Sequence, residues 1–124
     1  MSSLAPRNYR ATLTPARITD LPFVKGRSNR CLFAIPRNGP TDYAETCAIG
    51  EMFAAHYAQY LKDGGGTGFL ILIAREMAKS GLLEEHRPDG LHGYAVGFFS
   101  LIDSLVRHAI QTAEPFSMIE ESQS

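Results

Sequence analysis

The strongest helical pattern in this chain lies between Leu91 and Ile110, where the sequence reads LHGYAVGFFSLIDSLVRHAI. Apolar residues recur there every three or four positions, which is the spacing of one face of an α-helix. This face comprises Leu91, Tyr94, Ala95, Phe98, Phe99, Ile102, Leu105, Val106, Ala109 and Ile110. Gly93 and Gly97 weaken the start of the helix but permit close contact with another helix. The pattern predicts a helix over residues 91–113, ended by Pro115.

Two further helices are predicted upstream, over residues 42–62 and 68–80. The first contains no proline, and Thr41 is its expected N-cap because its hydroxyl suits that position. The second begins with Phe69–Ala74, which is apolar on every side, and continues in strong helix formers. A strand is the alternative for Phe69–Ile73. A helix that is apolar all round is either central to the fold or covered by a partner.

Residues 1–40 are predicted to form an extended basic segment with at most one or two short strands. Arg10–Thr14 fits a short edge strand, and Cys31–Ile35 fits a buried strand or an extended anchor ended by Pro36. With 124 residues, the chain is expected to form one mainly α domain. In this division, residues 41–114 are the helical body and residues 115–124 are a polar, acidic tail.

Charge is divided unevenly along the chain, although the formal net charge is −1. Seven bases and one acid lie in residues 1–37, whereas the remainder carries five bases and twelve acids. The seven bases are Arg7, Arg10, Arg17, Lys25, Arg27, Arg30 and Arg37. Three interpretations stay open: docking onto an acidic body, its own or that of a dimer partner; contact with nucleic acid; and binding to an acidic surface of a partner protein.

Four candidate chemistries fail on their sequence context. Gly64–Gly68 follows a predicted helix, not the strand that a phosphate-binding loop requires, so a helix stop is expected. The loop Glu84–His92 holds two histidines and acidic residues, but their spacing matches no zinc signature. The amphipathic helix predicted over residues 91–113 lacks the cationic face that is typical of membrane-binding helices. A nucleophilic dyad has no supporting local motif; its candidate members are Cys47, His56, Ser100, Ser104 and His108.

We therefore expect a non-enzymatic helical interaction protein that regulates or inhibits a partner protein, with no cofactor and no metal. The basic segment is its expected contact with an acidic partner surface. An aromatic helix interface is expected to support self-association into a homo-oligomer such as a dimer; its residues are Phe53, Tyr57, Tyr60, Phe98 and Phe99. Two alternatives are a nucleic-acid-binding protein that uses the basic segment on a helical dimer, and a small enzyme or ligand carrier with a pocket between helices.

The expected compartment is the cytoplasm, with Cys31 and Cys47 reduced. Two cysteines are too few for a disulfide scaffold of this size. No apolar run approaches the roughly 18 residues needed to span a bilayer, and no secretory signal is expected in the first 20 residues.

Overall fold

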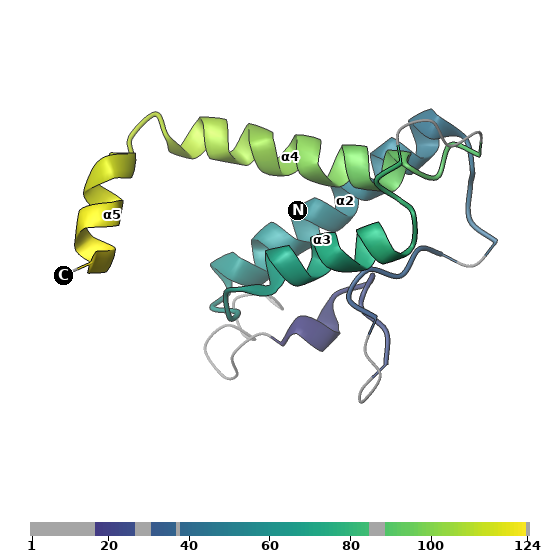
Figure 1. Cartoon of the computed structure of the whole chain (residues 1–124), viewed down its shortest axis with the longest axis horizontal. Helices are drawn as coiled ribbons and strands as arrows, with labels where there is room; N and C mark the ends of the chain where they lie inside the picture. The colour runs from purple at the N-terminus through teal and green to yellow at the C-terminus, as the bar shows by residue number, and fades with distance from the viewer. Residues whose placement is uncertain (1–16, 27–30, 37, 85–88, 124) are drawn as a thin grey trace, which may run out of the picture.

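The chain is mainly helical in the part that the structure, a computed structural model, describes: residues 17–26, 31–36, 38–84 and 89–123, without the side chains of residues 121–123. The elements are a short 3₁₀ helix η1 (Ile18–Asp20) and the helices α2 (Tyr43–Lys62), α3 (Phe69–Lys79), α4 (Gly93–Ala109) and α5 (Pro115–Gln123). The prediction of a mainly α fold with packed helices is confirmed. Figure 1 shows α2, α3 and the start of α4 gathered into one body, with α5 beyond the far end of α4.

Helix α2 begins one residue later than predicted, because Asp42 and not Thr41 is its N-cap. The Asp42 carboxylate accepts a hydrogen bond from the backbone N–H of Glu45 at 3.2 Å, which satisfies one of the donors that a helix start leaves open. At the other end, Gly64 adopts a φ of 93°. The backbone N–H groups of Gly64 and Gly65 donate to the carbonyls of Leu61 and Tyr60. The glycine loop therefore ends α2 in a Schellman motif.

Helices α2 and α4 form the main helix–helix contact, and small residues bring their backbones close together. A methyl group added at Gly50 would overlap the carbonyl oxygen of Tyr94, and one added at Gly97 would overlap that of Cys47. The buried Thr46 adds a polar link, because its hydroxyl donates to the carbonyl of Gly90 at 2.8 Å. The close helix contact expected at Gly97 is therefore made within one chain.

Part of the N-terminal segment belongs to the core. Phe23 and Phe33 are fully buried. The ring of Phe23 lies 5.3 Å from that of Phe33, 5.2 Å from Phe53 and 5.8 Å from Phe98. Aromatic pairs at such distances stabilise a core beyond the burial of their area.

The backbone of the same segment is extended but forms no strand within the described residues. A single antiparallel bridge joins Lys25 to Cys31, and the N–H of Ala34 donates to the carbonyl of Phe23 at 2.7 Å. Of the two alternatives for Cys31–Ile35, the extended anchor is therefore the one observed. The candidate strand Arg10–Thr14 lies outside the described residues.

The predicted helix over residues 68–80 is confirmed as α3, and the strand alternative is not observed. The helix is not covered on every side. Ile73 and Met77 are fully buried in the core, whereas Ile71 is 71% exposed. A second Schellman motif ends α3, with the N–H of Leu82 donating to the carbonyl of Met77 at 2.9 Å.

The C-terminal region differs most from the prediction. Helix α4 spans residues 93–109 rather than 91–113, and the expected polar tail forms the helix α5. Two side chains hydrogen-bond to carbonyls at the end of α4: Gln111 Nε2 donates to Arg107, and Thr112 Oγ1 donates to Ala109. Such side-chain bonds compete with continuation of the helix. Pro115 then starts α5, since proline has no N–H to lose at a first helical position.

Candidate functional site

The apolar face of α4 changes from buried to exposed along the helix. Tyr94 and Phe98 in its first half are 0% exposed, whereas Leu105 and Val106 in its second half are 42% and 51% exposed. These residues belong to one predicted face, so the face that packs on the core continues beyond the body. Figure 1 shows the second half of α4 diverging from α2 and leading to α5.

Helix α5 also carries exposed apolar side chains. It buries none of the residues whose side chains are described, and Phe116 is 81% exposed. We call residues 103–120 the arm, and its exposed large apolar side chains the arm surface. The arm surface comprises Leu105, Val106, Ile110, Phe116, Met118 and Ile119. Single scattered exposed hydrophobic residues are ordinary, whereas several large ones gathered in one region favour an interaction site.

An apolar groove of about 200 Å³ lies at the other end of α4. Its lining comprises Leu82, Leu83, His92, Ala95, Val96 and Phe99. Leu83 and Val96 are exposed, so the groove is open to solvent. Along α4, Phe99 and Ile102 connect the groove to the arm surface, and both are only partly buried.

His92 borders this groove and packs against Tyr43, with ring centroids 4.8 Å apart. Its Nδ1 atom is buried and has no hydrogen-bond partner among the described residues. The pKa of Tyr43 is raised, chiefly by a hydrogen bond with the side chain of Cys47. No described group of three His, Cys, Asp or Glu side chains is placed to hold a metal ion. His86, the first histidine of the candidate metal loop, lies outside the described residues.

Of the seven predicted contact cations, the structure describes Arg17 and Lys25, and both are exposed. Arg7, Arg10, Arg27, Arg30 and Arg37 lie outside the described residues. The apolar neighbours Ile18 and Val24 are buried. The described part of the basic segment therefore anchors itself by apolar contacts and turns its cations to solvent.

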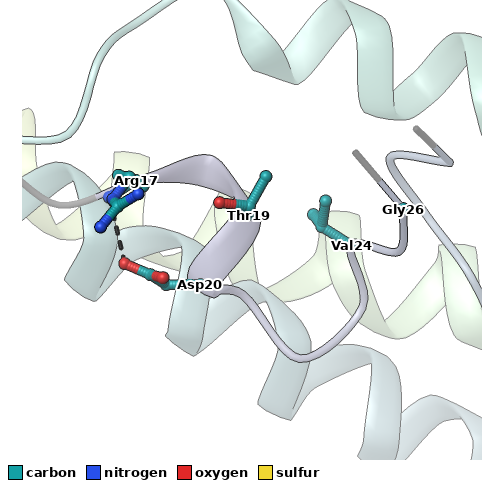
Figure 2. A pocket seen from close by; sticks show the side chains of 5 residues that line it. All are labelled: Arg17, Thr19, Asp20, Val24 and Gly26. Atoms are coloured by element: carbon teal, nitrogen blue, oxygen red, sulfur yellow. Dashed lines mark hydrogen bonds between the residues drawn. The ribbon is translucent and has the colours of Figure 1, made fainter. Parts of the chain in front are cut away.

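A broad surface hollow of about 770 Å³ lies beside η1 and includes Arg17. Figure 2 shows its described lining residues, which are Arg17, Thr19, Asp20, Val24 and Gly26. The backbone N–H of Arg17 donates to Asp20 Oδ2 at 3.3 Å. One cation and one carboxylate line the described part of the hollow, so its charge does not select for an anion.

The five aromatic residues predicted to form an interface are mostly inside the molecule. Phe53, Tyr57, Tyr60 and Phe98 are buried, and only Phe99 is partly exposed. The ring of Tyr57 lies 5.8 Å from that of Tyr60. Burial raises the pKa of Tyr57. In the single chain these four rings form core, so they provide no external aromatic surface.

The remaining candidate residues are spread over the described part of the chain. Ser100, Ser104 and His108 are exposed on α4, while Cys31 and Cys47 are free cysteines that are partly buried. Sequence reasoning placed Leu105, Val106 and Ile110 on the apolar face but missed the exposed apolar residues of α5. The signal for the latter was Phe116 and Ile119, three positions apart after a proline at a helix start.

Comparison with known proteins finds no matching family model, no matching curated protein and no matching solved structure. Within the described residues, no helix combines the length and the apolar character needed to cross a membrane. The functional argument therefore depends on the surfaces of this chain alone.

Proposed function

We propose that this chain is a non-enzymatic helical interaction protein that binds a partner protein through the arm surface. One observation carries the proposal: the core face of α4 continues into the arm, where Leu105 and Val106 are exposed. Burying an apolar side chain of this size contributes about 1.5–3 kcal/mol. A partner that covers the arm would gain this free energy at several positions.

The composition of the arm surface supports this proposal. Phe116 and Met118 belong to the residue types that are enriched in the buried centres of protein interfaces. Exposed Asp103 and Arg107 flank the apolar residues of α4, as polar groups do at the rim of an interface. The exposed Arg17 and Lys25 offer a second, electrostatic contact that would orient an acidic partner.

A comparison of matched variants tests the proposal. We expect Val106→Ser combined with Ile110→Ser to reduce capture of the partner from an extract of the native host by about tenfold or more. Ile71→Ser is the control, since Ile71 is an exposed apolar residue on α3, outside the arm. The captured protein is then purified, and its affinity for both variants is measured by calorimetry. Equal binding by the arm variant and the control would contradict the proposal.

A further inference from the structure

The groove beside the first turns of α4 has a buried apolar floor and an open rim. Leu82 and Ala95 are buried, so these two side chains form the floor. Leu83 and Val96 are exposed at the rim, and the ring of Phe99 is partly buried in the lining. A concave and mostly apolar surface with few polar groups is the usual form of a small-molecule site.

Backbone hydrogen bonds hold both sides of the groove in place. The N–H of Leu82 donates to the carbonyl of Met77 at 2.9 Å and thereby ends α3. The N–H groups of Ala95 and Val96 both donate to the carbonyl of His92 at 3.1 Å, in the first turn of α4. A site that is already formed loses little conformational entropy when a ligand binds. A ligand of this groove therefore meets a preformed surface.

The size of the groove suits a single aromatic ring. Its volume is about 200 Å³, and an apolar cavity of roughly 150 Å³ binds benzene. The ring of Phe99 in the lining offers an aromatic contact, which stabilises a pair of rings beyond the burial of their area. The groove therefore has room for one benzene ring with a small substituent.

The charge of the lining favours a neutral ligand. Among the described lining residues only His92 can carry a charge, because the others are leucine, alanine, valine and phenylalanine. Moving a charged group from water into apolar surroundings costs far more free energy than moving a neutral polar group. A neutral molecule is therefore favoured over a carboxylate, a phosphate or an ammonium ion.

His92 supplies the polar contact of the groove. Its Nδ1 atom is buried and has no hydrogen-bond partner among the described residues, although buried polar atoms in folded proteins nearly always have one. The ring of Tyr43 packs against the imidazole, with the centroids 4.8 Å apart. Half a turn about the Cβ–Cγ bond exchanges Nδ1 with a ring carbon and keeps the ring in the same plane. The imidazole can therefore turn this nitrogen outward without losing its contact with Tyr43.

We infer that the groove binds a small neutral aromatic alcohol, a phenol, with its ring on Leu82 and Ala95 and its hydroxyl group hydrogen-bonded to His92. A hydroxyl group both donates and accepts, so it pairs with either tautomer of the imidazole. This inference goes beyond the proposed function, because it assigns a second site that shares no residue with the arm surface. Its failure would leave the proposed function standing.

A titration with phenol, followed by the amide chemical shifts of the full chain, tests the site. We expect saturable shifts centred on residues 82–84 and 91–100, with a dissociation constant of about 1 mM. Toluene has a methyl group in place of the hydroxyl and should bind about tenfold more weakly, because it leaves the imidazole nitrogen unpaired. Shifts that do not saturate, or that are largest in the arm, would show adventitious binding only and overturn the inference.

Replacement of His92 tests the polar contact separately from the shape of the groove. His92→Phe keeps a ring against Tyr43 and removes both nitrogen atoms. We expect this variant to bind phenol about tenfold more weakly than the wild type, while its affinity for toluene does not fall. A merely structural role of the ring would weaken both ligands alike, so an equal loss would contradict the hydrogen bond to His92.

Filling the groove tests its position. Ala95→Leu adds a branched side chain to the floor and should abolish phenol binding, with circular dichroism to confirm the helix content. Val96→Phe narrows the rim and leaves the buried floor unchanged, so it provides the same test if Ala95→Leu does not fold. Ile71→Ser is the control and should bind phenol as the wild type does, because Ile71 lies outside the groove. Undiminished binding by a folded groove variant would place the phenol elsewhere and refute the site.

Discussion

Gly97 is one of the residues where the backbone of α4 lies close to that of α2, so its replacement tests their packing. A methyl group there would overlap the carbonyl of Cys47, which belongs to a rigid helix backbone. We expect Gly97→Ala to lower the free energy of unfolding by about 1–3 kcal/mol, because the two helices must move apart. Alanine favours helix over glycine by about 1 kcal/mol, so any net loss is steric. Urea denaturation monitored by circular dichroism measures the change.

Gly66→Ala is the matched control for this residue-scale prediction. Around Gly66 the nearest atom that a methyl group would meet is Tyr60 Oη at 3.7 Å, which is an ordinary van der Waals contact. We expect its effect to stay within about 0.5 kcal/mol. If the Gly97→Ala variant were as stable as this control, the result would contradict the close packing of α2 against α4 at Gly97.

At the scale of single elements, two adjacent polar residues at the start of α2 have different roles. Asp42 accepts the hydrogen bond from the N–H of Glu45, whereas Thr41 precedes the cap. Asp42→Ala should therefore cost about 1 kcal/mol of unfolding free energy, the usual loss for an N-cap. Thr41→Ala should change it by less than about 0.5 kcal/mol. Thermal and urea unfolding of the two variants provide the comparison, and the reverse order would make Thr41 the cap.

The helices themselves could be predicted from periodicity and stop signals, but their ends depend on individual side chains. Gln111 and Thr112 bond to carbonyls at the end of α4, and this competition is invisible in an apolar pattern. Pro115 was interpreted as the end of a helix, although it also suits a first helical position. The helix α5 was missed for that reason.

The exposure of the arm could not be predicted from the sequence either. Phe98 and Leu105 occupy the same apolar face, yet one is buried and the other is exposed. The difference comes from the course of α4 in space: its first half packs on α2, and its second half diverges from α2 (Figure 1). A periodic pattern describes a face of one helix and not how far its neighbours reach.

At the scale of the whole molecule, one core contains residues from both the basic N-terminal segment and the acidic remainder of the chain. Phe23 and Phe33 come from the basic segment, and Phe53 and Phe98 come from the acidic remainder. Apolar contacts thus fix the described part of the basic segment on the body. Because Arg17 and Lys25 remain exposed, their charges are available to a partner even though the segment is anchored.

The same core makes the free energy of unfolding depend on pH in the alkaline range. Burial raises the pKa of Tyr57 and of Tyr94 above the unfolded value of about 10. In that range the folded chain holds more protons than the unfolded chain, so the free energy of unfolding decreases as pH rises. The contribution of both tyrosines is fully present below about pH 10 and is lost as pH rises through their folded pKa values.

We therefore expect the urea midpoint to fall above pH 10, and to fall less steeply in a variant with Tyr57→Phe and Tyr94→Phe. Phenylalanine keeps the buried ring and removes the ionising hydroxyl, so the difference between the two slopes isolates these residues from lysines that titrate nearby. The hydroxyl of Tyr94 donates only a long bond, 3.5 Å to the carbonyl of Pro40, so its loss changes little at neutral pH. Identical slopes for the variant and the wild type would show that neither hydroxyl is buried in the folded chain.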